Sequence, residues 1–235
     1  ATVTALGDFA IAESDALQLL DIETSDGAII ITAGDSIAVT KVNSSATDDG
    51  SNPIAITTTA NDINVETLTG GYANNVTLTA AGSILDDGVH ATGITANNLI
   101  LVAAGTISSD TTAATLTASS TGSGNIDIDQ TGAVTLDSLT NHNGSITVDS
   151  NGALVATNIS SAATDDGSND ITLNTSDGSI QIGVLDAGSL GDVTLDSATT
   201  ILDDDNLATE IRAQAIHATA KGQITLQTNV DSIHA

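Results

Sequence analysis

The sequence lacks cysteine, methionine and tryptophan, and it has one phenylalanine and one tyrosine in 235 residues. The absence of cysteine excludes a disulfide framework, a thiolate zinc site and a thiol nucleophile. Large aromatic side chains dominate most cores, so Phe9 and Tyr72 leave this core to Ile, Leu, Val and Ala. Hydrophobic residues make up 40% of the chain, which is enough for one large folded domain or two ordinary ones.

Basic residues are equally scarce, because Lys41, Arg212 and Lys221 stand against 30 acidic residues and give a formal net charge of -27. A nucleic-acid partner is excluded, since neutralising phosphates requires Lys and Arg, and anionic membrane surfaces are disfavoured. No run approaches the roughly 18 consecutive apolar residues of a membrane helix, so we expect no membrane insertion. Residues 1–10 lack the regions of a signal peptide, and we expect Ala1 to be an internal or processed start.

A repeat of 117 residues spans the chain. The segment Ala-Thr-Asp-Asp-Gly-Ser-Asn occurs at 46–52 and again at 163–169, and the same shift carries 84–87 onto 201–204. Two units, residues 1–117 and 118–235, account for essentially the whole sequence, so no residues remain for distinct end caps. The repeat predicts two continuous tandem units cut from something longer.

Within each unit, short runs of alternating apolar and small polar residues are separated by turns rich in Gly, Asn, Asp and Ser. Period-two alternation indicates strands, and those turn residues tolerate left-handed backbone. Strands are expected at 125–129, 133–137, 145–149, 170–174, 192–196 and 223–227. The strands that start at 125, 145, 170 and 192 are 20, 25 and 22 residues apart, and five turns averaging 23.4 residues fill one unit.

Two local features bear on the strand assignment. Pro53 stands immediately before the strand-like run 54–56, where a missing amide donor is tolerated. Residues 207–220 could also be a helix, but their counterpart 90–103 ends in the strand-like run 99–102, so a strand is favoured.

The strands could form either two antiparallel sandwiches or a coil of stacked parallel strands, and the core composition favours the coil. Stacked coils about 4.8 Å apart place like side chains above one another, which suits Ile, Val and Thr. A sandwich normally needs larger central side chains. The predicted fold is therefore all-β: a parallel β-helix, or β-solenoid, of about ten coils of 20–26 residues in two tandem repeats, roughly 48 Å long.

The Gly-x-Ile-x-Ile strands, the Asp-Gly and Asn-Gly turns, the coil length and the missing cysteine resemble the repeat regions of filamentous-haemagglutinin-like bacterial surface adhesins. The resemblance covers essentially the whole chain and implies a right-handed parallel β-helix in an exported fibre or stalk. It also implies an extracellular, cell-surface or secreted location, and contact with a host or partner cell.

Paired carboxylates in the turns are the candidates for chemistry. Calcium prefers hard oxygen ligands, so these turns could hold Ca²⁺ as the cofactor. The alternative is that they form solvated turns and keep the protein soluble, and this alternative is favoured because neither EF-hand spacing nor a calcium-binding nonapeptide occurs. The candidate metal ligands are Asp48, Asp49, Asp86, Asp87, Asp165, Asp166, Asp203 and Asp204.

Three functions remain open after this inspection. A structural segment of a surface fibre is favoured, because uncapped solenoid ends would stack on identical repeats or subunits. The alternative is an adhesin module that binds a surface glycan or a partner cell, with ice as a weaker target. A carbohydrate-active enzyme is disfavoured and no catalytic residue is proposed, because lyase chemistry needs clustered basic residues and sugar clefts usually need aromatic platforms. The four histidines are dispersed and are expected in turns or at the surface.

Overall fold

The computed structural model describes residues 1–90, 93–206 and 211–234 of the chain. Every regular element in these residues is a β-strand, and the pairings between the strands are parallel. No described element is a helix with the length and hydrophobicity needed to cross a membrane. The predicted all-β parallel solenoid is confirmed, with about 11 turns.

The chain divides into two compact units, Ala1–Ala114 (unit 1) and Thr115–Ala235 (unit 2). Unit 1 contains β1 (Thr2–Ala5), β2 (Phe9–Glu13), β3 (Leu17–Leu19), β4 (Asp21–Thr24), β5 (Ile29–Ala33), β6 (Ile37–Asn43), β7 (Ile54–Thr58), β8 (Ile63–Thr69), β9 (Val76–Ala80), β10 (Ile84–Asp86) and β11 (Gly93–Ala103). The boundary falls within β12 (Ile107–Ser123). Unit 2 continues with β13 (Ile126–Gln130), β14 (Val134–Asn143), β15 (Ile146–Ser150), β16 (Leu154–Ser160), β17 (Ile171–Thr175), β18 (Ile180–Asp186), β19 (Val193–Ser197), β20 (Ile201–Asp203), β21 (Ile211–Ala220) and β22 (Thr228–His234).

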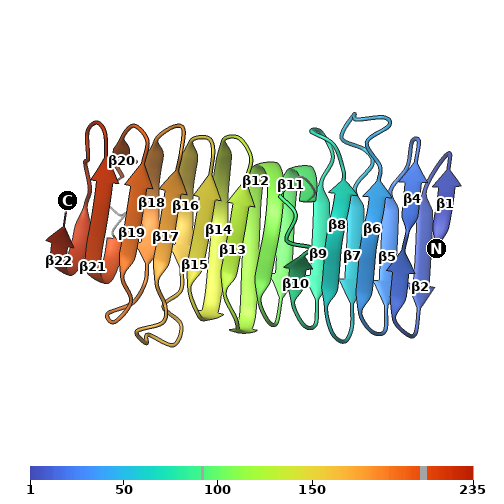
Figure 1. The fold of residues 1–235 in the computed structure, drawn as a ribbon, viewed down its shortest axis with the longest axis horizontal. Coiled ribbons are helices and arrows are strands. Elements are labelled where there is room, and N and C mark those ends of the chain that lie inside the picture. Colours follow the sequence, from blue (N-terminus) through green and yellow to red (C-terminus); the bar gives the residue numbers. More distant parts are fainter. Residues whose placement is uncertain (91–92, 207–210, 235) are drawn as a thin grey trace. The chain divides into compact units, whose positions relative to one another are not determined.

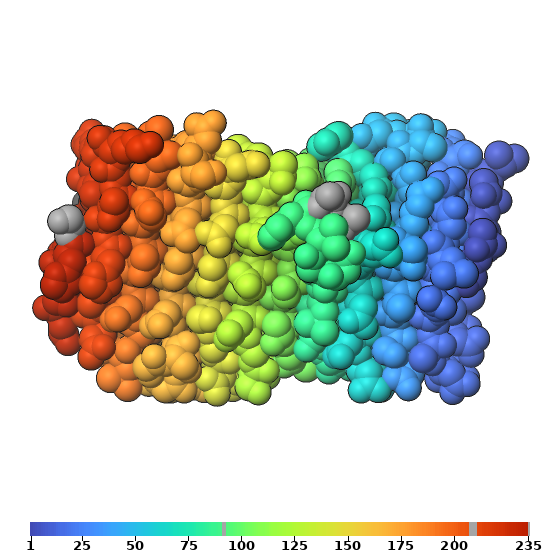
Figure 2. Space-filling model, viewed as in Figure 1, coloured from blue at the N-terminus to red at the C-terminus, as the bar shows by residue number. Residues whose placement is uncertain are grey.

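Each unit has three faces, which we name A, B and C. In unit 1, face A stacks β2, β5, β7, β9 and the second half of β11 in register. Face B stacks β3, the first halves of β6 and β8, and β10. Face C stacks β1, β4, the second halves of β6 and β8, and the first half of β11. Figure 1 shows β5, β7 and β9 side by side, and Figure 2 shows the successive coils of unit 1 packed on one another.

Unit 2 repeats this arrangement, because β13, β15, β17 and β19 form its face A with Ile126, Ile146, Ile171 and Val193 in one register column. The predicted spacings of 20, 25 and 22 residues are therefore confirmed. The strands β15 to β20 lie 117 residues after β5 to β10, with the same lengths. The sequence repeat is thus a repeat of structure, strand by strand.

The core of each unit consists of inward-pointing aliphatic ladders. On face A of unit 1, Ile31, Ile56 and Leu78 stack in consecutive strands and are fully buried. Burial of each such side chain is worth about 1.5–3 kcal/mol relative to leaving it exposed. The two aromatic residues lie outside this core, since Phe9 is half-buried in the first coil and Tyr72 is 73% exposed.

Buried hydroxyl groups form the corners between faces. The Oγ1 atoms of Thr24, Thr58 and Thr175 each donate to a carbonyl three residues ahead, at 2.7, 3.0 and 3.0 Å. These bonds satisfy the hydroxyls where the chain leaves face A or face C, and they hold the turn that follows.

One predicted strand is wrong. Residues 223–227 contain only an isolated bridge between Ile224 and Ile201, and the last strand, β22, begins at Thr228. Ile107 makes the equivalent single pair with Ile84 in unit 1. Alternation shows that a residue can point inward, but it does not show that a neighbouring strand continues beside it. The favoured strand at 207–220 is confirmed over Ile211–Ala220 as β21, and residues 207–210 lie outside the described residues.

Candidate acidic turns and polar surface sites

The eight predicted aspartates lie at the ends of strands or in the loops that follow faces B and C. Asp48 and Asp49 lie between β6 and β7, and their counterparts Asp165 and Asp166 lie between β16 and β17. The others end or follow the short strands β10 and β20. In the described part of the chain, the structure brings them together as sequence neighbours within each turn.

The first aspartate of the repeated loop binds the next coil. In unit 1, the carboxylate of Asp48 accepts hydrogen bonds from the backbone N–H groups of Tyr72 and Ala73, both at 2.8 Å, and from Asn74 Nδ2 at 3.4 Å. Gly71 precedes them at φ 87°. A Cβ there would lie 2.5 Å from Asp48 Oδ1. Both the positive φ and the close approach of this carboxylate therefore require glycine.

Unit 2 repeats this bond between coils with Asp165. Its carboxylate accepts from the backbone N–H and the hydroxyl of Ser189, and from Leu190 N at 3.3 Å. The serine hydroxyl is the main cause of the lowered pKa of Asp165, followed by the serine amide. Gly188 stands at φ 81° in the position equivalent to Gly71. The identical loop sequence therefore encodes a carboxylate that fastens successive coils.

The second aspartate of the repeated loop closes its own turn. Asp49 Oδ1 accepts from the amide of Ser51 at 2.9 Å and from its hydroxyl at 2.6 Å, and Asp166 Oδ1 accepts from the amide of Ser168 at 2.9 Å. In both, the hydrogen bond from the serine hydroxyl is the main cause of a pKa below the usual aspartate value. These are Asx-type turns, in which aspartate stabilises its own loop.

Three of the remaining aspartates make similar local bonds. Asp86 Oδ2 accepts from Gly88 N at 2.6 Å, Asp87 Oδ1 from Val89 N at 2.9 Å, and Asp204 Oδ1 from Asn206 N at 2.9 Å. Asp203 ends β20 and pairs in register with Ile182.

Ca²⁺ is normally held by six to eight oxygen atoms. Among the residues that the structure describes, none of the eight aspartates belongs to a group of three or more His, Asp or Glu ligand atoms close enough to share an ion. Protein hydrogen bonds to the carboxylates support the solvated-turn interpretation, and they are made to Asp48, Asp49, Asp86, Asp87, Asp165, Asp166 and Asp204. Calcium binding at these turns remains an untested prediction.

Two of the three basic side chains pair with carboxylates on other coils. Arg212 Nη1 donates to Asp186 Oδ1 at 3.0 Å, and Nη2 lies 3.4 Å from Asp165 Oδ2. In unit 1, Lys41 Nζ lies 3.2 Å from Asp21 Oδ1 and also donates to Glu23. Sequence inspection missed these pairs, although separations of 18 to 26 residues within each pair of adjacent coils match one coil length.

Comparison of the chain with known protein families, curated proteins and solved structures finds no match. Its own geometry must therefore support any assignment of function.

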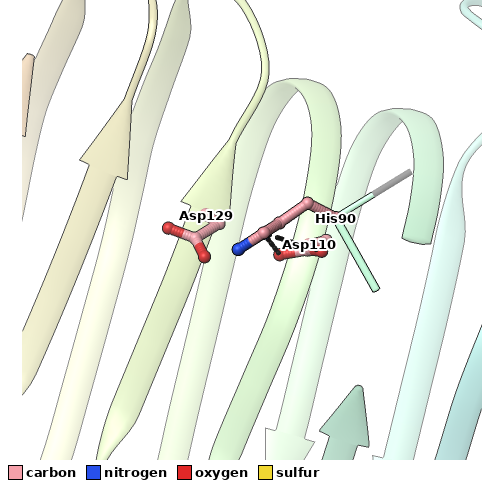
Figure 3. A group of neighbouring side chains, drawn as sticks. All are labelled: His90, Asp110 and Asp129. Carbon is pink, nitrogen blue, oxygen red and sulfur yellow. Dashed lines mark hydrogen bonds and ion pairs between the residues drawn. The ribbon is translucent and has the colours of Figure 1, made fainter. Parts of the chain in front are cut away.

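A histidine and an aspartate also meet at the surface of unit 1. His90 Nδ1 lies 3.3 Å from the Asp110 carboxylate, and the histidine side chain is 80% exposed (Figure 3). The expected surface position of this histidine is confirmed.

Unit 2 carries a shallow groove of about 380 Å³. Ser119, Thr140 and Ser160 line it from consecutive strands in register on face C, and Asn141 and His142 extend the lining. No charged residue is among the residues that line the groove. It is therefore an uncharged, hydroxyl-rich depression on an acidic protein.

Proposed function

We propose that this chain is a structural segment of an extracellular surface fibre, in which a stiff acidic β-solenoid stacks end to end with further repeats or subunits. The observation that carries the proposal is that the outermost coils have open edges.

The first coil of unit 1 is covered on one side only. Its strands β1, β2 and β3 pair with β4, β5 and β6, and none has a second partner among the described residues. Val3, Phe9 and Ile11 point inward but remain half-exposed, whereas Ile22 and Ile31 at equivalent positions one coil later are fully buried. A preceding coil would cover these side chains.

The last coil of unit 2 is open in the same way. Within the described residues, β22 pairs only with β21. Val230 is half-buried and Ile233 is 55% exposed. Unpaired strand edges of this kind recruit another strand. The covering coil would come either from a longer chain or from a second copy.

Two further features support a fibre. Backbone hydrogen bonds along the stacking direction resist bending, and the net charge of -27 opposes unspecific sideways aggregation. The resemblance to bacterial surface adhesins adds an exported location to the proposal.

The test is negative-stain electron microscopy and small-angle X-ray scattering of the purified chain across a concentration series, with and without calcium. We expect particles that lengthen as the protein concentration rises. Particles of one fixed length at every concentration would count against end-to-end stacking.

A second candidate function is glycan binding at the uncharged groove of unit 2. Hydroxyl and amide groups suit a neutral saccharide, because each can exchange hydrogen bonds with sugar hydroxyls. Saturation-transfer NMR with neutral oligosaccharides tests it. We expect signals that Thr140→Val weakens, and the absence of any signal across a saccharide panel would refute this candidate.

A further inference from the structure

The outward positions of face A in unit 1 are uncharged. Its outward positions form two columns that run through five consecutive strands in register. None of the ten residues is charged, and all are at least partly exposed. The first column is Ala10, Ile30, Ala55, Thr77 and Ile100, and the second is Ala12, Thr32, Thr57, Thr79 and Val102.

The same surface in unit 2 provides an internal comparison. Its two columns, 117 residues later, carry four aspartates: Asp127 in the first, and Asp129, Asp149 and Asp196 in the second. Partial desolvation, followed by the charges of Asp129 and Asp149, raises the pKa of Asp127. The fold therefore accepts acidic residues at these positions, and their absence from unit 1 is not a requirement of the solenoid.

We infer that face A of unit 1 packs laterally against the same face of a second copy of this chain. Copies with a net charge of -27 repel each other. They can approach closely only through surfaces that bring no carboxylates together, because opposed like charges cost several kcal/mol. Ile30, Ile100 and Val102 also gain from leaving water, and Ile30 is 53% exposed.

The size of the surface sets the strength of this contact. Five strands about 4.8 Å apart, each presenting about five residues, give roughly 300 Å² per copy. A stable complex buries about 800 Å² per partner. One pair of faces therefore associates weakly, and several copies of unit 1 joined in one assembly would associate more strongly through their combined contacts. This inference goes beyond the proposed end-to-end stacking and holds without it.

Small-angle scattering and sedimentation velocity of the intact chain distinguish the two contacts, since lateral pairing increases the cross-section and end-to-end stacking increases only the length. We expect the cross-section to increase as protein approaches the millimolar range, and more so in about 0.5 M NaCl, where screening weakens repulsion between the acidic surfaces. A cross-section that stays constant while the length grows would overturn lateral pairing and leave the fibre proposal intact. A strict monomer would overturn lateral pairing and weaken the fibre proposal as well.

Matched variants locate the contact. Ala55→Asp puts one carboxylate at the centre of face A in unit 1, and Thr172→Asp puts one at the equivalent position in unit 2. We expect the first to raise the concentration needed for pairing by at least about tenfold and the second to leave it nearly unchanged. Thr77→Asp and Thr194→Asp form a second such pair, and circular dichroism confirms that each variant folds. Equal effects within both pairs, or adsorption to a flat polysaccharide or to ice without self-pairing, would overturn the inference.

Discussion

The cost of truncating one inward isoleucine should depend on how many coils cover it. Ile11 and Ile31 occupy the same register column on face A of unit 1. Ile31 lies between β2 and β7 and is fully buried, whereas Ile11 has a neighbouring strand on one side only and is half-exposed. The same substitution at the two positions therefore isolates the contribution of the second neighbouring coil.

The magnitude follows from the structure. Changing Ile31 to Ala removes three methyl or methylene groups at about 0.8 kcal/mol each and leaves a closed cavity, for a total of about 3–4 kcal/mol. At Ile11 roughly half of the transfer term applies and the space opens to water, so we expect about 1 kcal/mol. Because stacked repeats unfold in part as separate units, the loss in the free energy of unfolding should be measured both by native-state hydrogen exchange and by urea denaturation.

These measurements must be made at low protein concentration, where the edge is uncovered. Equal costs for Ile11→Ala and Ile31→Ala under those conditions would refute the solenoid account of the core. A cost for Ile11→Ala that rises with protein concentration would show that another coil covers the edge.

Gly71→Ala should destabilise unit 1 by about 1–2 kcal/mol more than Gly88→Ala. Both glycines have positive φ, but only at Gly71 would the new Cβ meet the Asp48 carboxylate. Equal losses of stability in thermal melts of the two variants would refute the role of Asp48 between coils. Asp127→Asn should stabilise the protein near neutral pH. The raised pKa means that the folded state holds this proton more tightly than the unfolded state, so the contribution to stability is present at low pH and is lost as pH rises through the raised pKa. Urea midpoints of both proteins against pH test this, and an unchanged profile contradicts it. For Asp49, Asp165 and Asp166 the pKa is lowered, so their contribution to stability should be lost as pH falls through the lowered values. Acid titration of alanine variants of their serine partners, Ser51, Ser189 and Ser168, would show a smaller loss. Calcium should leave the melting temperature unchanged, because the turn carboxylates already accept protein hydrogen bonds; a saturating rise that EDTA reverses would instead establish a calcium site.

Much of the fold could be predicted from the sequence, for physical reasons. The alternation of apolar and polar residues predicted which side chains point inward. The separations of 20, 25 and 22 residues gave the coil length that places Ile126, Ile146 and Ile171 in one column. The pairing partners of a strand depend on where the chain turns, which is why residues 223–227 were wrongly predicted as a strand.

The candidate site was harder to predict than the fold. Asp48 and Asp165 were correctly placed in turns, but their bonds to the following coil depend on the position of a loop about 24 residues away. The absence of charge at the outward positions of face A in unit 1 was also missed. It becomes visible only when outward positions of five coils are aligned, although the repeat itself would have allowed that comparison.

The most direct test of the account is a cryo-electron microscopy structure of the assembled protein. The account predicts filaments in which parallel strands stack about 4.8 Å apart, with β1, β2 and β3 of one segment paired to the last coil of another and Ile11 buried. Discrete particles in which both outermost coils remain uncovered at every concentration would contradict it.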